Sequence, residues 1–300
     1  MRFSVWPNPA RTPDEILDLA RTADGGPWYG LWFADHYMPN TGGPDVADGD
    51  VHECWSILPA VAAVTERIRL GPLVAPTSIH HPALLANRAA TIDQLSNGRF
   101  VLGLGAGWQI NEHRAYGFDL EEPKVRVDRF EESIQIVRSL LDTHRTTFHG
   151  THYSVDDAPC QPTPVQATLP ILVGTGSPRM LGITARHAQE WNTWGAPALA
   201  ADRMQVFRAA CEKAGVDPHG HHTSVQALVR FDDTGEARPW DGWDDRTVMG
   251  GDDQIVDRLG RYVEDGVDEF IVPDFALGET AEERADAVHR FAEQVIPQFR

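Results

Sequence analysis

Cysteine is scarce in this sequence, and the cysteines that occur are not spaced for a common task. There are 3 among 300 residues, Cys54, Cys160 and Cys211, and no two of them form a C-x-x-C pair. An odd number of widely separated cysteines gives no sign of a disulfide framework and is typical of a reducing compartment. We therefore expect the protein to lie in the cytoplasm.

Positive charge is also short, because 26 lysines and arginines face 44 aspartates and glutamates, giving a formal net charge of -18. Nucleic acids and anionic membrane surfaces both require a basic footprint, so neither is an expected partner. The N-terminal residues MRFSVWPNPA lack the apolar core of a signal peptide, and no apolar run approaches the length of a membrane span. A small-molecule substrate remains compatible with this composition.

No linker-like composition divides the chain, so we expect residues 1–300 to form a single domain. Within it, β-rich runs alternate with helical patterns. The predicted strands cover residues 2–6, 30–36, 67–78, 100–107, 170–176, 190–195, 222–231 and 268–275. The predicted helices cover residues 12–24, 55–66, 82–98, 125–143, 177–188, 199–215, 252–266 and 281–296. Strand–helix units in this number predict a parallel α/β sheet closed into a (β/α)8 TIM barrel.

Three segments exceed the minimal strand–helix unit. They are residues 37–54 after the second strand, 144–169 before the fifth strand and 232–250 after the seventh. The middle segment alternates β-forming residues around His149 and Gly150, which predicts a small hairpin. The third segment is polar, and we expect it to form a surface loop.

The third predicted strand, RIRLGPLVAPTS, breaks the rules for a buried strand. Gly71 and Pro72 lie in its middle and Pro76 follows. Proline cannot donate a hydrogen bond to a sheet and is confined to edges, first residues or bulges. Composition alone leaves this feature unexplained.

In a barrel of this kind the active site lies at the carboxyl ends of the strands. Asp35 and His36 end the second strand, where a catalytic acid or base is expected. The alternative is equally open: an aspartate that caps the following loop beside a solvated histidine. No H-x-H motif ends the first strand, so we expect no metal site.

Two glycine-rich turns also follow strands. Gly105, Ala106 and Gly107 form a weak dinucleotide signal but would allow a planar ring to approach the backbone. Trp108 follows this turn. Its side chain either covers a pocket or packs against other side chains without a functional role.

The second turn consists of Gly174, Thr175 and Gly176, after which Ser177 and Pro178 open a helix. The free N–H groups at such a helix start form a ready anion site. The alternative is a tight turn that needs its glycines for geometry alone.

Several blocks together resemble the bacterial luciferase-like oxidoreductases, and most closely the actinobacterial branch that uses the deazaflavin coenzyme F420. The blocks are GLWFADH, the run from AAVTERIRLG to GLGAGW, EHRAYG, RFEESIQIVRSLL and PILVGTG. The resemblance covers about residues 1–195 and continues more weakly to the end of the chain. It implies a barrel that binds flavin or deazaflavin at the strand ends and transfers a hydride to or from an organic substrate.

The resemblance also implies roles for individual residues. Asp35 and His36 match the pair that faces the ring, with His36 as the proton donor or acceptor. The third strand matches a bulge with a cis peptide against the ring, and we place that bond between Pro72 and Leu73. The turns that match the ring, ribityl chain and phosphate of the cofactor contain Gly105, Ala106, Gly107, Gly174, Thr175, Gly176 and Ser177.

One departure concerns the substrate. Sugar-phosphate dehydrogenases of this family carry a glutamate where this chain has Trp108, and the lysine expected after the sixth strand is missing. An apolar or aromatic substrate lying against Trp108 and Trp194 therefore fits better. An FMN-dependent monooxygenase is the alternative, a non-catalytic flavin-binding barrel is a further one, and a homodimer is possible.

Overall fold

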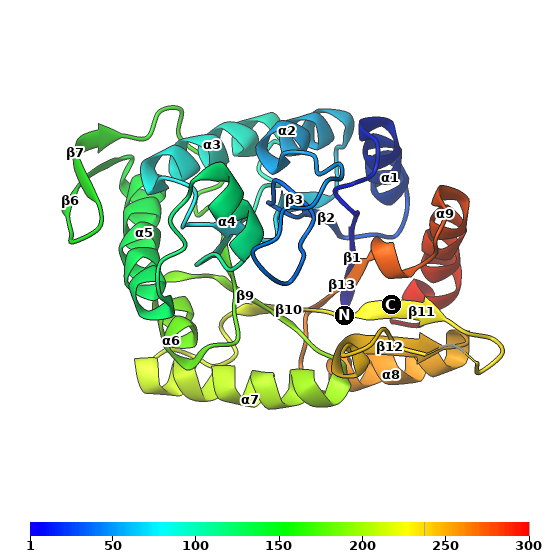
Figure 1. Ribbon diagram of the computed structural model, residues 1–300. Helices are drawn as coiled ribbons and strands as arrows, with labels where there is room; N and C mark the ends of the chain where they lie inside the picture. Colours follow the sequence, from blue (N-terminus) through cyan, green and yellow to red (C-terminus); the bar gives the residue numbers. More distant parts are fainter. Residues whose placement is uncertain (237, 300) are drawn as a thin grey trace.

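The computed structural model describes residues 1–236 and 238–299 and contains a barrel of parallel strands enclosed by helices (Figure 1). The strands of the main sheet are β1 Arg2–Trp6, β2 Gly30–Phe33, β3 Arg69–Pro72, β4 Ala75–Pro76, β5 Leu102–Gly105, β8 Ile171–Gly174, β9 Glu190–Trp194, β10 His222–Gln226 and β13 Glu269–Pro273. Their order is β3-β2-β1-β13-β10-β9-β8-β5-β4. The two ends of this order, β3 and β4, are consecutive parts of one broken strand. The barrel therefore closes, and the predicted (β/α)8 fold is confirmed.

The helices follow the strands as the sequence pattern predicts. They are α1 Pro13–Gly25, α2 Cys54–Val64, α3 Pro82–Leu95, α4 Ile110–Tyr116, α5 Pro123–Thr143, α6 Pro178–His187, α7 Pro197–Ala214, α8 Asp252–Glu264 and α9 Ala281–Arg290, followed by short turns to Phe299. Thr12 and Glu15 form a reciprocal capping box at the start of α1. The short helix α4 was not predicted. Within the described part of the chain, no helix has the length and apolarity to cross a membrane.

Two of the three insertions contain strands of their own. β6 Arg145–His149 and β7 Ser154–Pro159 form the predicted antiparallel hairpin. The predicted seventh strand, residues 222–231, is wrong as one element: β10 ends at Gln226, and β11 Leu228–Phe231 leaves the barrel. β11 pairs in parallel with β12 Thr247–Gly250, and the short helix η1 Asp244–Arg246 comes directly before β12. The third insertion is therefore fastened to the barrel by its own ladder.

The break in the third strand is where the strand changes partner. Pro72 still pairs with Phe33, and the Leu73 N–H donates to the Phe33 carbonyl at 2.8 Å, so the ladder with β2 runs through Leu73. Pairing with β5 begins at Ala75. The cis peptide lies between Leu73 and Val74, so the predicted position between Pro72 and Leu73 is wrong by one residue. The reason is that Pro72 belongs to the regular ladder and the chain leaves it only after Leu73.

Glycines make this close approach of backbones possible. A Cβ atom on Gly71 would lie 2.1 Å from the Val101 carbonyl oxygen, and one on Gly103 would lie 2.0 Å from the Pro72 carbonyl oxygen. No side chain fits at such distances, because the obstacle in each case is backbone. These glycines allow the broken strand to reach β5 and close the barrel.

We expect Gly103→Ala to lower the free energy of unfolding by about 1–3 kcal/mol or more, the usual range for overpacking a tight interior. Urea titration, with midpoint and slope recorded, measures the change. The matched control is Gly260→Ala in α8, where an added Cβ meets nothing within 4 Å. The control should stabilise by up to about 1 kcal/mol through helix propensity. Equal midpoints for the two variants would contradict this account of barrel closure.

Candidate active site

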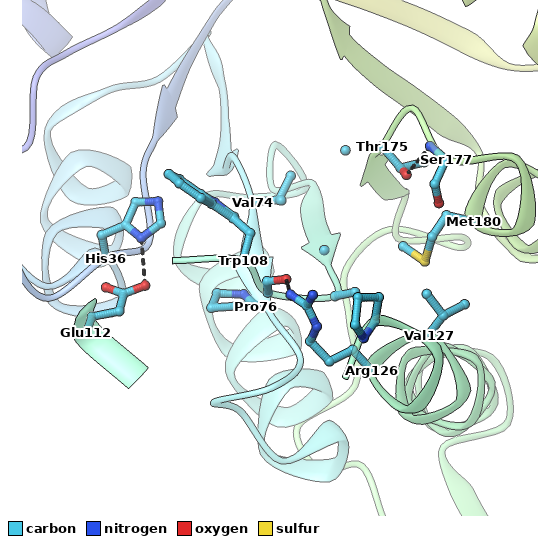
Figure 2. Close-up of a pocket in the computed structure, with 15 residues that line it drawn as sticks. His36, Val74, Pro76, Trp108, Glu112, Arg126, Val127, Thr175, Ser177 and Met180 are labelled. Carbon is cyan, nitrogen blue, oxygen red and sulfur yellow. Dashed lines mark hydrogen bonds and ion pairs between the residues drawn. The ribbon is translucent and has the colours of Figure 1, made fainter. Parts of the chain in front are cut away.

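Two adjoining cavities open at the carboxyl ends of the barrel strands. The small cavity has a volume of about 240 Å³ and the large cavity about 1010 Å³. Figure 2 shows the small cavity between the end of β2, the turn after β5 and the start of α6. The residues that line both cavities, and so mark their junction, are His36, Val74, Trp108, Gly174 and Thr175. All of these except Val74 are residues that the sequence placed at the site.

His36 is held at this junction by a buried carboxylate. Its Nδ1 atom lies 2.9 Å from Oε1 of Glu112, and the other carboxylate oxygen accepts the Tyr37 backbone N–H at 2.9 Å. Only 1% of the Glu112 side chain is exposed, against 23% of the His36 side chain. An ionised carboxylate can only accept, so Nδ1 carries the hydrogen and Nε2 is left as the atom that can exchange a proton with a ligand.

Glu112 is one of the residues at this site that were not predicted from the sequence. It lies on α4, whose seven residues are too few to show a helical period. Trp108 stands where the family resemblance led us to expect a glutamate in a sugar-phosphate dehydrogenase, and Glu112, four positions later, supplies a carboxylate to His36. Glu112 is the first residue of the EHRAYG block, and its place in that block was the one sequence feature that could have indicated a functional role.

Asp35 lies behind the site and faces away from the cavities. Its Oδ2 atom accepts the Trp55 indole N–H at 2.9 Å and lies 2.8 Å from Nε2 of His80. It is fully buried, and it is not among the described residues that line either cavity. Asp35 therefore holds in place the segment that carries His36. The Nε2 atom of His80 is engaged in the contact with Asp35.

The broken third strand forms the wall between the two cavities. Leu73 lines the large cavity, while the predicted Pro72 is not among the described residues that line either cavity. Val74 lines both cavities, and its side chain packs where Cβ atoms on Gly105 and Gly174 would come within 2.7 and 3.1 Å of it. Val74 can occupy this position because these two glycines have no side chains.

The predicted turn residues divide between the cavities. Gly105, Ala106, Gly107 and Ser177 line the small cavity, Gly174 and Thr175 line both, and Gly176 lines the large one. Gly107 has φ +91°, and a Cβ there would lie 2.0 Å from the Ser78 hydroxyl. Ser78 in turn lies 2.8 Å from Nε2 of His113, and burial lowers the pKa of that histidine.

The small cavity also has a cation that was not predicted. Arg126 on α5 lines it and donates from Nη1 to the Gly107 carbonyl at 2.6 Å. Its Nε atom is buried without a hydrogen-bond partner among the described residues. Across the cavity, the start of α6 has no side-chain cap. The Ser177 hydroxyl and the N–H groups that follow Pro178 in the first turn are therefore available to an anion.

The large cavity has aromatic walls. Trp108, 57% exposed, stands edge-on to His36 with ring centroids 5.5 Å apart. Trp194 packs against Trp6 and Trp243 at centroid distances of 5.7 and 5.4 Å. The aromatic residues that line this cavity are Trp6, Trp108, Trp194, Trp240, Trp243 and Phe275. The two predicted tryptophans therefore both line the large cavity.

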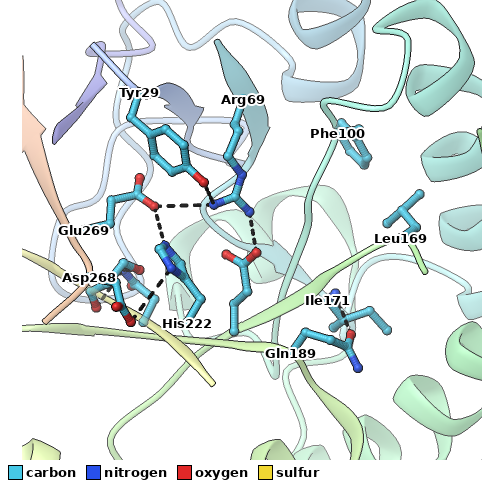
Figure 3. Close-up of polar contacts among 12 residues, drawn as sticks. Tyr29, Arg69, Phe100, Leu169, Ile171, Gln189, His222, Asp268 and Glu269 are labelled. Carbon is cyan, nitrogen blue, oxygen red and sulfur yellow. Dashed lines mark hydrogen bonds and ion pairs between the residues drawn. The ribbon is translucent and has the colours of Figure 1, made fainter. Parts of the chain in front are cut away.

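Titratable residues at the opposite end of the barrel form a closed network (Figure 3). Arg69 pairs with Glu190 and lies 3.7 Å from Glu269, which also accepts from His222 at 3.0 Å and from the Trp32 indole at 2.7 Å. Burial raises the pKa of Glu190. For Glu269, burial is outweighed by the His222 hydrogen bond and the Arg69 charge, which lower its pKa. These charges pair with one another and support the barrel floor, while Oε2 of Glu190 is buried without a hydrogen-bond partner among the described residues.

Charges near α6 are also already paired. Arg179 contacts Asp128 at 2.5 Å, and Arg186 contacts Glu131 at 2.8 Å. Neither arginine is therefore a spare cation for a polyanionic ligand. Over residues 1–236 and 238–299, no group of three or more His, Cys, Asp or Glu side chains is placed to hold a metal ion.

We expect Glu112→Gln to release His36 from its single tautomer, because a glutamine cannot accept from both the Nδ1–H and the Tyr37 N–H. Nitrogen NMR of the imidazole should report the Nδ1–H form in the unmodified protein and a tautomer mixture in the variant. The matched control is Glu121→Gln, which alters a partly exposed pair with Arg129. An unchanged His36 spectrum in Glu112→Gln would remove Glu112 from this role.

The sequence is similar to those of known oxidoreductases. The family model described as luciferase-like monooxygenase matches residues 1–239. An F420-dependent glucose-6-phosphate dehydrogenase from Kineococcus radiotolerans is 34% identical over 74% of this chain and 65% of its own length. One from Amycolatopsis mediterranei is 33% identical over 59% of this chain, which spans only 50% of that relative. An F420-dependent hydroxymycolic acid dehydrogenase from Mycobacterium tuberculosis is 28% identical over 88% of this chain and 72% of its own length.

Solved structures share the fold over the whole chain. The F420-dependent tetrahydromethanopterin reductase from Methanopyrus kandleri superposes with a TM-score of 0.83 at 18% identity, covering 100% of this chain and 99% of its own. The monooxygenase RslO1 from Streptomyces bottropensis gives 0.81 at 22% identity and covers 100% of both chains. Because the family model covers well over half of the sequence, the chain belongs to the luciferase-like monooxygenase family.

Proposed function

We propose that this protein is an F420-dependent oxidoreductase that transfers a hydride between the deazaflavin and a small organic substrate. The observation that carries the proposal is His36, fixed by Glu112 and presented where the two cavities meet. The family relatives named as F420-dependent dehydrogenases support the choice of cofactor.

The residues of the small cavity suit a phosphate-bearing cofactor. The uncapped start of α6, the Thr175 and Ser177 hydroxyls and the partly free Arg126 guanidinium together offer donors to a phosphate. Gly105 and Gly174 keep the wall beside Val74 thin enough for a flat ring to approach. When bound, the deazaflavin supplies or accepts the hydride.

The protein's own residues would manage the proton. In the oxidation of an alcohol, the carbon loses a hydride and the hydroxyl loses a proton, and His36 Nε2 is placed to take that proton. Glu112 stabilises the imidazolium that results, and Trp108 restricts access of water from one side. In the reverse direction, His36 returns the proton to the carbonyl oxygen.

The large cavity favours an apolar substrate. Its walls carry six aromatic side chains, and Trp108 occupies the position that holds a glutamate in sugar-phosphate dehydrogenases of this family. The family relatives named as glucose-6-phosphate dehydrogenases therefore differ from this chain in substrate under our proposal. A cavity of about 1010 Å³ has room for a substrate, which disfavours the alternative of a non-catalytic flavin-binding barrel.

An FMN-dependent monooxygenase is the second candidate. It is supported by the pyrimidine monooxygenase RutA of Cronobacter sakazakii, 32% identical over 62% of this chain and 55% of its own length. Reduced FMN reacts with oxygen whereas the deazaflavin practically does not, so the cofactor decides between the two activities.

The proposal extends to assembly and location. We propose that residues 1–300 act as one domain, that the protein works in the cytoplasm, and that it forms a homodimer. The three cysteines are free and buried, which suits a reducing compartment. Light scattering of the purified chain tests the dimer, and a monomeric mass would rule it out.

Titration of the purified protein with F420 and with FMN, followed by fluorescence, tests the cofactor. We expect saturable binding of F420 and at least about tenfold weaker binding of FMN, a difference of about 1.4 kcal/mol. Binding of FMN alone, together with oxygen consumption in the presence of a flavin reductase, would select the monooxygenase instead.

His36→Asn tests the proton role. Once an alcohol panel has yielded a substrate that reduces F420, we expect kcat to fall by about 100- to 10,000-fold in this variant, with F420 affinity little changed. The control is His149→Asn, a substitution on the exposed hairpin. Full turnover in His36→Asn would exclude His36 from the reaction.

A further inference from the structure

The large cavity has two arginines on the side opposite His36. Arg203 comes from α7, which follows β9, and Arg246 ends the short helix η1 in the third insertion. In the order of strands around the barrel, β9 stands four positions from β2, which carries His36 at its end. Among eight positions this is directly across the mouth.

Arg203 is fixed in direction by the strand end below it. Its Nη1 donates to the Thr193 hydroxyl at 3.0 Å and to the Trp194 carbonyl at 2.6 Å. Its guanidinium carbon lies 3.8 Å from where a Cβ on Gly176 would be, so it reaches over that turn. Both bonds use one nitrogen, which leaves the Nη2 edge for a ligand.

Arg246 is fixed by the insertion that carries it. The Ala196 backbone N–H donates to the Asp245 carbonyl at 2.7 Å, which ties η1 to the start of α7. The Arg246 guanidinium lies 5.5 Å from the centre of the Trp243 ring. Its Nε is buried without a hydrogen-bond partner in the described part of the chain, and its nearest carboxylate, Asp245, is 3.7 Å away.

The two cations are poorly compensated. Burial and the neighbouring charge of Arg246 lower the pKa of Arg203, with Asp245 opposing them. Asp245 is not among the described residues that line the large cavity, and the one carboxylate among those residues is Asp50, on the insertion that follows β2. Paired guanidiniums in a cavity with apolar walls are a site for an anion, and their planar forks match a carboxylate.

We propose that Arg203 and Arg246 bind a carboxylate of the substrate, whose apolar body lies against the tryptophans and whose reacting carbon lies near His36. This inference rests on the proposed function. Because the arginines and His36 stand on opposite sides of the mouth, the carboxylate must be remote from the reacting carbon. Simple hydroxy acids, in which the two groups are adjacent, are therefore excluded as substrates.

Binding of a matched pair of probes tests the proposal. Hydrocinnamate and its uncharged amide share one shape, and their binding is followed by quenching of tryptophan fluorescence, without cofactor and with saturating F420. We expect the carboxylate to bind at least about tenfold more tightly than the amide, as charge-assisted hydrogen bonds imply. Raising the salt concentration should reduce the difference in affinity between the carboxylate and the amide.

Substitutions of the two arginines test whether they cause the preference for the carboxylate probe. Arg203→Met and Arg246→Met should each abolish most of the preference for the carboxylate while leaving amide binding unchanged. Arg203→Lys, which keeps the charge but loses the fork, should retain part of it. The control, Arg179→Met on α6, should behave like the unmodified protein. Thermal unfolding of each variant verifies that it is folded.

Two results would overturn the proposal. One is equal binding, or no binding, of the two probes to the unmodified protein. The other is a loss of F420 affinity in Arg203→Met without a change in probe preference, which would assign Arg203 to the cofactor site. Because the probe measurement needs no cofactor, it remains readable even if the F420 titration fails, so the two proposals can fail separately.

Discussion

The architecture depends on the contact between the broken third strand and β5. Gly103 lies so close to the Pro72 carbonyl that a single carbon atom would not fit between them, and Gly71 repeats this contact against Val101. The same approach that closes the barrel turns the chain at Leu73 and Val74. Val74 then separates the two cavities. Barrel closure and the shape of the site are thus results of one backbone packing arrangement.

The chemistry at the junction rests on a second, polar layer. His36 is bound by a carboxylate from α4, while the residue before it, Asp35, is bound on the other side by Trp55 and His80. Two successive residues therefore point in opposite directions and are each fixed by buried partners. A histidine restrained in this way loses little rotational freedom when a ligand arrives, which favours a defined proton path.

Much of this could be predicted from sequence because it is periodic or local. The alternation of strands and helices gives the barrel, and the capping box at Thr12 marks the start of α1. The bulge was expected from the family resemblance, but its cis bond was placed one residue too early, since its position depends on where β2 pairing ends. Glu112 could not be assigned to His36 because 76 residues separate them. Arg203 and Arg246 were missed because only the folded insertion brings them to one cavity.

The parallel pairing of β11 with β12 separates two tasks in the protein. The insertion between them carries Trp240, Trp243 and Arg246 to the large cavity. It is held by the β11–β12 ladder, by the Ala196 N–H and by the ion pair of Asp233 with Arg290 on α9. The small cavity is built entirely from barrel turns and their helices. Substitutions at the described residues of this insertion would therefore change the large cavity and leave the small cavity intact. Under the proposed function, substrate preference could change in this way while the cofactor site stays the same.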